Sequence, residues 1–138
     1  MSLIDTFHFD IYVAVCYSEP GWPDHWMVLL RHPGADRCAY RFHSLQNNVD
    51  FQLAIEYNTR FDSRSIKQTF YLGRIPTSAI CTVEREAHAV PPQSCQCWVL
   101  YFLLRLQWNH LVPLGTYEHW RDNHVESHRV DRGPGIGQ

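Results

Sequence analysis

A thiol and two histidines are the side chains of this sequence best suited to covalent chemistry. Cys95 follows the segment Pro91-Pro92-Gln93-Ser94, whereas His25 and His43 lie far earlier in the chain. A cysteine thiolate is a strong nucleophile when a base within hydrogen-bond reach can take its proton and a third group orients that base. Cys95, His25 and His43 could supply these three roles, which predicts a nucleophilic cysteine site.

The position of Cys95 depends on the helix that must carry it. Two prolines cannot continue a helix, and Ser94 is a favoured N-cap whose hydroxyl can accept from a free backbone N–H of the following turn, so we expect a helix to begin at about Cys95. Cys95 shares one face of this helix with apolar side chains. These side chains are Trp98, Val99, Phe102, Leu103 and Leu106.

A helix N-terminus also favours the charged form of a thiol. Its dipole and free N–H groups, with a cationic neighbour, can lower a cysteine pKa from about 8.5 to between roughly 3.5 and 7.5. Cys97 points to another side of the same helix and is not the expected attacking group. The alternative for Cys95 is a small buried core residue without chemistry, because free cysteine is among the most buried residue types.

The two histidines lie at the ends of two predicted strands. His25 opens the apolar run to Leu30, and the run from Cys38 to Ser44 returns after a turn at residues 32–37. In an antiparallel pair, the start of one strand lies beside the end of the next, so His25 and His43 are expected to be neighbours.

The remaining elements complete an α+β domain. Alternating apolar residues predict a strand over 7–17, and two more strands are expected over 51–57 and 66–72. A short helix is expected over 79–87 with Thr77 or Ser78 as N-cap, and a polar helix over about 116–130. We therefore predict an antiparallel sheet of about four to six strands packed against the cysteine helix and one or two further helices. The expected domain spans residues 1–131, and residues 132–138 have the composition of a flexible C-terminal tail.

Composition narrows the class of protein. The 138 residues are 45% hydrophobic and 14% aromatic, as expected of a single domain with a sizeable core. The net charge is −2 and Lys67 is the only lysine, which argues against a nucleic-acid partner. The first residues lack a secretory signal pattern and no apolar run reaches membrane-spanning length. Five cysteines without a paired framework favour a reduced, cytoplasmic protein.

These motifs resemble the lecithin retinol acyltransferase/HRAS-like suppressor family. The resemblance rests on His25-Trp26 opening a strand, on Phe42-His43-Ser44-Leu45 ending the next, and on Cys95-Gln96-Cys97-Trp98-Val99 opening a helix. That family carries His-Trp, Ile-His-Leu and Asn-Cys-Glu-His-Phe-Val at these places, and a group of small fungal proteins carries a similar His-Trp and Cys-Gln-x-Trp pattern. The similarity covers roughly residues 9–106.

The resemblance implies a circularly permuted, NlpC-type papain-like fold in which the histidines precede the cysteine. It also implies that His25 is the general base, His43 its orienting partner and Cys95 the acyl-accepting nucleophile. Ser94 stands in place of the family's Asn, and Gln96-Cys97 in place of its Glu-His. Fold and reaction type therefore transfer better than substrate.

We therefore expect a cysteine-dependent hydrolase or acyltransferase that works through a thioester. The backbone N–H of Cys95 would hold the oxyanion, with Gln93 as a candidate second donor and Ser94 in support. The expected partner is a small molecule with an apolar acyl group, and no cofactor or metal is expected. The predicted pocket walls are Trp22, Trp26, Tyr40 and Trp98.

The sequence is also compatible with three alternatives to a cysteine-dependent acyl-transfer enzyme. One is a zinc site formed by Cys95, Cys97, His124 and His128. Another is a cyclase or binding protein for a small metabolite on the same fold without an acyl-enzyme, and a third is a peptide or isopeptide hydrolase that uses the same three residues. The sequence also leaves a homodimer open.

Overall fold

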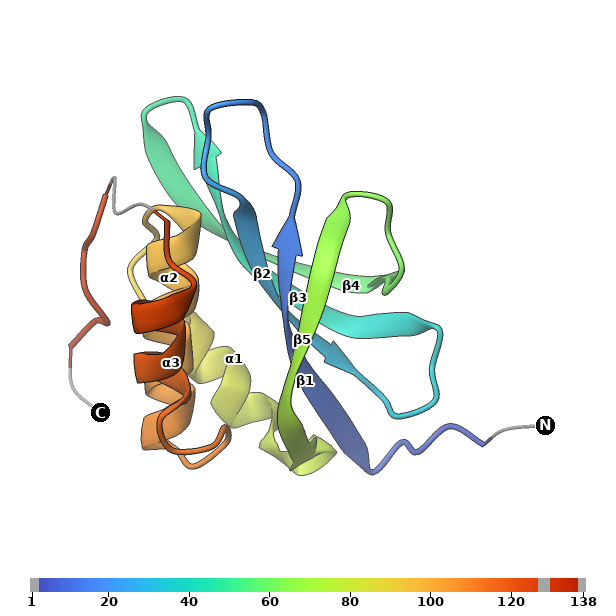
Figure 1. The fold of residues 1–138 in the computed structure, drawn as a ribbon. Coiled ribbons are helices and arrows are strands. Elements are labelled where there is room, and N and C mark those ends of the chain that lie inside the picture. The colour runs from blue at the N-terminus through green and yellow to red at the C-terminus, as the bar shows by residue number, and fades with distance from the viewer. Residues whose placement is uncertain (1–2, 127–129, 137–138) are drawn as a thin grey trace.

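A single antiparallel sheet carries helices on one of its faces (Figure 1). The computed structural model describes residues 3–126 and 130–136. The strands are β1 (His8–Cys16), β2 (His25–Arg31), β3 (Arg37–Asn47), β4 (Asp50–Arg60) and β5 (Ile66–Pro76). They lie in the order β4-β3-β2-β1-β5, and every pairing is antiparallel. The predicted α+β class and strand count are confirmed.

Within the described residues, three α-helices and one short 3-10 helix follow the strands. They are the 3-10 helix η1 (Thr77–Ala79), α1 (Ile80–Ala89), α2 (Cys95–Trp108) and α3 (Thr116–Asn123). Helix α2 packs against β2 and β3 on one side and against α1 and α3 on the others. Because nearly every side of α2 is covered, Cys97 is fully buried, although the sequence placed it away from the apolar face.

The main core lies between the sheet and α2. Alternate residues of β1, Phe9, Ile11 and Val13, face this core, as the period of two along a strand predicts. They meet Val99, Phe102 and other apolar residues of α2, so the cysteine helix is fixed along most of its length. Burial of this apolar surface is the dominant favourable term in folding.

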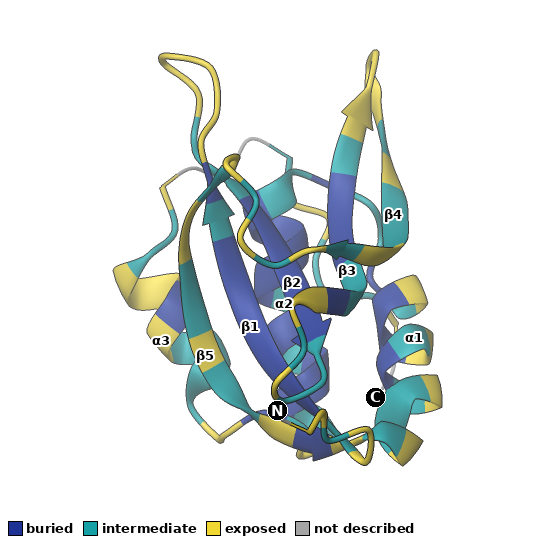
Figure 2. Cartoon of the chain, turned by 90° about the vertical axis from the view of Figure 1, so that its right-hand side faces the viewer, coloured by how far each residue is buried: buried dark blue, intermediate teal, exposed yellow. Residues whose placement is uncertain are grey.

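The opposite face of the sheet is covered by chain rather than by a helix. Consecutive strands β4 and β5 lie at opposite edges, so the segment 61–65 crosses this face to join them. Phe61 packs on Tyr12 there, with ring centroids 4.8 Å apart. The central strands are buried from both sides as a result (Figure 2).

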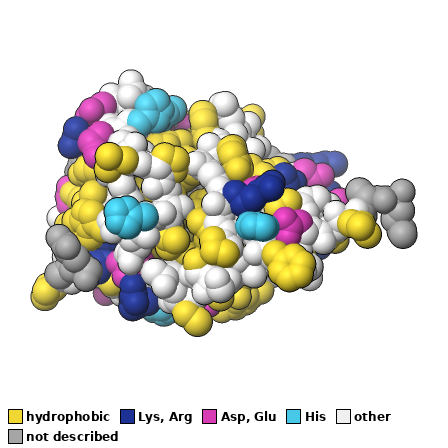
Figure 3. All heavy atoms as spheres, turned by 90° about the horizontal axis from the view of Figure 1, so that it is seen from below, with side chains coloured by type: hydrophobic (Ala, Val, Ile, Leu, Met, Phe, Trp, Pro, Cys, Tyr) yellow, Lys and Arg dark blue, Asp and Glu magenta, His cyan; other side chains and the backbone are white. Residues whose placement is uncertain are grey.

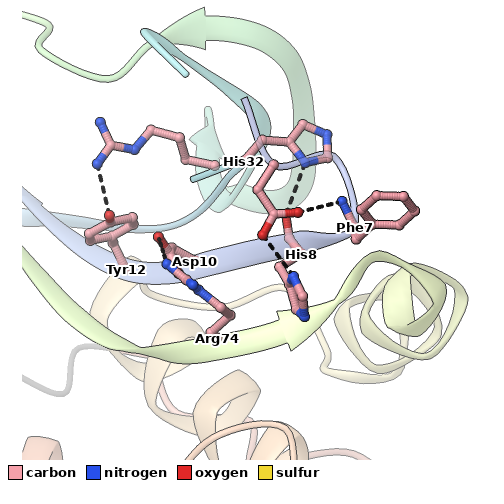
Figure 4. A network of polar contacts seen from close by, with 8 residues as sticks. Phe7, His8, Asp10, Tyr12, His32 and Arg74 are labelled. Atoms are coloured by element: carbon pink, nitrogen blue, oxygen red, sulfur yellow. Dashed lines mark hydrogen bonds and ion pairs between the residues drawn. The ribbon is translucent and has the colours of Figure 1, made fainter. Parts of the chain in front are cut away.

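A polar network holds the start of β1 (Figure 4). The Asp5 carboxylate accepts hydrogen bonds from the backbone N–H of Phe7 and from His8 Nδ1, each at 2.8 Å. His32 Nδ1 bonds the carbonyl oxygen of His8 at 2.9 Å. His25 pairs with Cys16 at the other end of β1, so His8 and His32 lie away from the predicted cysteine site.

The C-terminal third differs from the sequence prediction. Helix α3 ends at Asn123 and does not continue to residue 130. The backbone N–H groups of Glu126 and Val130 donate instead to the side chains of Gln96 and Ser94, at 2.8 Å each, which removes them from any helical ladder. The start of α1 also differs, because Ala79 is its N-cap and neither Thr77 nor Ser78 caps it.

Residues 132–135 do not project as a free tail. Gln93 Oε1 accepts the backbone N–H of Arg132 at 2.7 Å, and Arg105 Nη1 donates to the carbonyl of Pro134 at 2.9 Å. The described part of the C-terminal segment is thus attached to α2 and the segment before it.

Within residues 3–126 and 130–136, no helix combines the length and apolarity needed to cross a membrane. Among the described residues on the face shown in Figure 3, the basic side chains are interspersed with acidic and apolar ones and form no continuous patch.

Candidate active site

A cavity of about 380 Å³ lies where α2 begins, beside the start of β2 and the end of β3. Cys95 and His25 both line it. Its other lining residues are Ser18, Glu19, Trp22, Pro23, Ser44, Leu45, Gln46, Phe51, Ser94, Gln96 and Val130. The structure therefore brings the predicted nucleophile and the predicted base to one cavity.

Side-chain bonds from the start of α2 fix the position of Cys95. Gln96 Nε2 donates to the carbonyl of Asp24 at 2.9 Å, and Gln96 Oε1 accepts the backbone N–H of Glu126 at 2.8 Å. The Ser94 hydroxyl accepts from Val130 N–H rather than from the helix, so Ser94 is the N-cap by position only. Gln96 thus ties the nucleophile's helix to the residue before His25.

The Cys95 sulfur rests on backbone polar groups at the start of β2. Its Sγ donates to the carbonyl of Asp24 at 3.8 Å. Burial raises the pKa of the Cys95 thiol, and the backbone N–H groups of Trp26, Gln96 and Cys95 offset only part of that effect. The expectation of a lowered thiol pKa is therefore wrong, because the loss of hydration outweighs the favourable helix N-terminus.

The two histidines are neighbours, as predicted from the strand pairing. His25 Nε2 and His43 Nδ1 are 2.8 Å apart. Burial, with the nearby His43 and Arg41, lowers the pKa of His25 to about 4, and burial also lowers that of His43. Both imidazoles are therefore neutral at pH 7, and His25 can act as a proton acceptor.

Sequence reasoning missed Glu56, which continues this chain of contacts. His43 Nε2 and Arg41 Nε each lie 2.7 Å from Glu56 Oε1. Arg41 pairs directly with Glu56 across β3 and β4, and His43 lies on the same face of β3 two residues further on. The sequence carries a signal for this contact, because a two-residue turn at 48–49 sets the register in which β3 and β4 pair.

Cys95 and His25 do not form a hydrogen bond with each other among the described contacts. The second ring nitrogen of His25, Nδ1, also has no hydrogen-bond partner within the described residues. This nitrogen therefore carries no hydrogen bond to another described residue, and His25 itself lines the cavity. Cys16 is a second thiol to consider, since it pairs with His25 across β1 and β2, but it is buried and its pKa is raised to about 11, chiefly by burial.

Gln93 is not an oxyanion donor. Its amide hydrogens donate to the carbonyls of Pro91 and Gly133, at 2.8 Å each, and its side chain is fully buried outside the cavity lining. Its role is to bind the C-terminal segment. The backbone N–H of Cys95 at the start of α2 remains the candidate donor.

Only Trp22 of the four predicted wall residues lines the cavity. Trp26 and Trp98 are core residues, packed against Trp120 and Phe102 with centroids 5.2 Å and 4.9 Å apart. Tyr40 lies edge-on to Phe9. These aromatics contribute to packing because their strand and helix positions face the core rather than the mouth of the site.

The zinc alternative finds no support in the described residues. No group of three or more His, Cys, Asp or Glu there could hold a metal ion. His124 stacks on Trp120, and Cys97 is buried inside α2; His128 lies outside the described residues.

Comparison of this chain with protein-family models, curated proteins and solved structures finds no match. The class that the structure defines is an α+β protein with a five-stranded antiparallel sheet and a cysteine at the start of its buried helix.

Proposed function

We propose that this protein is a cysteine-dependent acyl-transfer enzyme, a hydrolase or acyltransferase, in which Cys95 forms a thioester. The observation that carries the proposal is the shared cavity. Cys95 and His25 both line it, and His25 is held from behind by His43 while its Nδ1 has no partner among the described residues. The order of two histidine strands followed by a cysteine helix also agrees with the resemblance to the permuted papain-like family.

The proposed reaction starts from a neutral Cys95 thiol and a neutral His25 imidazole. The pKa of Cys95 is raised and that of His25 is lowered to about 4, so a preformed thiolate and imidazolium are disfavoured. His25 Nδ1 therefore takes the thiol proton as the sulfur attacks the carbonyl carbon, in general-base catalysis. The oxyanion forms beside the backbone N–H of Cys95.

Collapse of this intermediate breaks the bond to the leaving group, which takes the proton from His25. Water or an amine then attacks the thioester carbonyl, and His25 accepts the proton of the attacking group. That proton returns to the departing sulfur, which restores the Cys95 thiol. The cycle balances without a metal, an oxidant or a cofactor.

The cavity walls favour an uncharged acyl group. Trp22, Pro23, Leu45, Phe51 and Val130 supply apolar surface. Among the described residues no lysine or arginine lines the cavity, and the acidic Glu19 there disfavours an anionic substrate. An apolar pocket with few polar groups is typical of small-molecule sites. The proposed substrate is an ester, thioester or amide of a small apolar acid.

A second candidate function is a cyclase or binding protein that uses the cavity without an acyl-enzyme. The contact of the Cys95 thiol with the Asp24 carbonyl favours this alternative, because the sulfur is hydrogen-bonded to backbone rather than to His25.

Two cysteine variants distinguish the acyl-transfer enzyme from the cyclase or binding protein. The substrate is a p-nitrophenyl ester of a short apolar acid, and the variants are Cys95→Ala and the matched control Cys16→Ala. We expect Cys95→Ala to lower kcat/KM on the order of 10³-fold or more, because loss of a nucleophile leaves only binding and oxyanion contacts. Cys16→Ala retains activity, since Cys16 is outside the cavity lining.

Intact-mass measurement of the quenched reaction should show one acyl group, and peptide mapping should place it on Cys95. Full activity in a folded Cys95→Ala variant, or an acyl group on Cys16, would remove the mechanism. Ester binding without any adduct would support the cyclase or binding alternative.

A further inference from the structure

The Glu56 carboxylate lies outside the cavity lining and takes no part in the steps above. It nevertheless ends an unbroken chain of contacts, which we call the histidine relay: Glu56 Oε1, His43 Nε2, His43 Nδ1 and His25 Nε2. Its two links measure 2.7 Å and 2.8 Å. These short distances require one proton in each link, and the proton positions follow from the chemistry of Glu56.

An ionised carboxylate only accepts hydrogen bonds. Bonding to Arg41, with a further contribution from His43, holds the pKa of Glu56 below its usual range, so this carboxyl is ionised at pH 7. The proton in the first link must then belong to His43 Nε2. Since the neutral imidazole carries one proton, His43 Nδ1 is bare and accepts.

The second link is fixed by the first. His43 Nδ1 can only accept, so the proton between the rings belongs to His25 Nε2. Neutral His25 then has its lone pair on Nδ1, which has no other partner in the described part of the chain. This nitrogen is the base that the proposed function requires.

We propose that Glu56 is a positioning residue, which sets the tautomers of His43 and His25 so that His25 presents an unprotonated Nδ1 to the cavity. The catalytic consequence rests on the proposed function, whereas the proton arrangement is a property of the resting protein. Glu56 acts through His43 and touches no reacting atom.

Arg41 gives Glu56 a fixed place. Its Nε donates to the same oxygen that His43 contacts, and the two strands pair directly at Arg41 and Glu56. Among the described residues, other titratable or charged groups around the relay are Cys16 from β1, Asp24 before β2 and Cys95 from α2. Glu19 lines the same cavity as His25, and Glu126 accepts the backbone N–H of Asp24. Cys16 and Cys95 are neutral at pH 7 because both thiol pKa values are raised.

The direct test is the nitrogen-bound proton pattern of the two imidazoles, read from long-range ¹H–¹⁵N correlations of the ¹⁵N-labelled protein at pH 7. Signals are assigned with His25→Gln and His43→Gln. We expect a protonated Nε2 and a bare Nδ1 in both rings. A proton on Nδ1 of His43 would overturn the inference, whether or not the protein is active.

Two variants of Glu56 distinguish the effect of its hydrogen-bond acceptor from the effect of its negative charge. Glu56→Gln keeps an oxygen that can accept from both His43 and Arg41, so we expect unchanged tautomers and activity within about tenfold of the wild type. Glu56→Ala removes the acceptor, so His43 should show a mixture of tautomers and kcat should fall about 10- to 100-fold with KM unchanged. Glu84→Ala on α1 is the control and should change neither.

Three results would contradict the role of Glu56: wild-type tautomers in Glu56→Ala, changed tautomers with full activity, or a Glu56→Gln variant as impaired as Glu56→Ala. If the proposed function itself is wrong, the same two measurements give another result. In that case the tautomers would be as assigned, while Cys95→Ala would hydrolyse the ester as well as the wild type.

Discussion

At the scale of single residues, the resting site is neutral. Desolvation disfavours the charged form of an acid and of a base alike, so it raises the pKa of Cys95 and lowers that of His25. Each shift opposes transfer of the proton before substrate arrives. In the proposed reaction the thiol proton would therefore move as the sulfur attacks, unlike in cysteine enzymes that store a thiolate.

The reactivity of Cys95 towards iodoacetamide should follow from this neutral state. We expect its alkylation rate to be low at neutral pH and to rise only above the pH range of free cysteine, because the thiolate is the reacting form. The measurement is mass-spectrometric quantification of the Cys95 peptide between pH 5 and pH 10.

Exposed Cys81 is an internal reference for reagent and unfolding. Rapid alkylation of Cys95 with a plateau near pH 7 would show a stored thiolate and contradict the neutral pair.

At the scale of elements, the site is a junction between the start of α2 and the start of β2. Gln96 makes this junction, with bonds to the Asp24 carbonyl and to the Glu126 N–H. Its side chain is almost fully buried, so the amide group itself lies away from water. A buried polar group left without a partner costs about 1–3 kcal/mol.

Replacing Gln96 should therefore loosen the junction. We expect Gln96→Ala to lower the free energy of unfolding by about 2 kcal/mol. Gln52→Ala is the control on β4, where the side chain is exposed, and should change stability by less than about 0.5 kcal/mol. Urea unfolding followed by tryptophan fluorescence measures both, and equal losses would mean that the Gln96 bonds contribute nothing specific.

At the scale of the whole molecule, the C-terminal segment is part of the folded unit. Gln93 binds both Arg132 and Gly133, and Arg105 binds the Pro134 carbonyl. Val130 of the same segment lines the cavity. The segment therefore contributes to the site as well as to stability.

Two glycines in this segment give a matched test. Both have positive φ, 75° at Gly133 and 91° at Gly135, so alanine costs roughly 1–2 kcal/mol at either position. At Gly135 the new Cβ would also collide with the Ala89 carbonyl oxygen, whereas nothing lies within 4 Å of a Cβ at Gly133. We expect Gly135→Ala to lower the unfolding free energy by about 1–3 kcal/mol more than Gly133→Ala.

Thermal or urea unfolding of the two variants gives this difference directly. If both variants lose the same stability, the packing of residue 135 against α1 contributes nothing, and the segment is not an integral part of the fold.

The sequence alone determined the five strands, the start of α2 and the neighbourhood of the two histidines, whereas it extended the last helix too far and misplaced the N-cap of α1. Alternation along β1, the apolar runs of β2 and β3, and the Pro-Pro-Gln-Ser start of α2 are local signals, and hairpin geometry places His25 beside His43. Only the tertiary structure decided the other features. The register of β3 and β4 brings Glu56 to His43. The pKa of the Cys95 thiol depends on its total burial. Gln93 and Ser94 bind a segment more than 35 residues away, rather than an oxyanion or the N-terminus of the helix. Local patterns fix backbone conformation, but desolvation and side-chain partners depend on residues that meet only when the chain has folded.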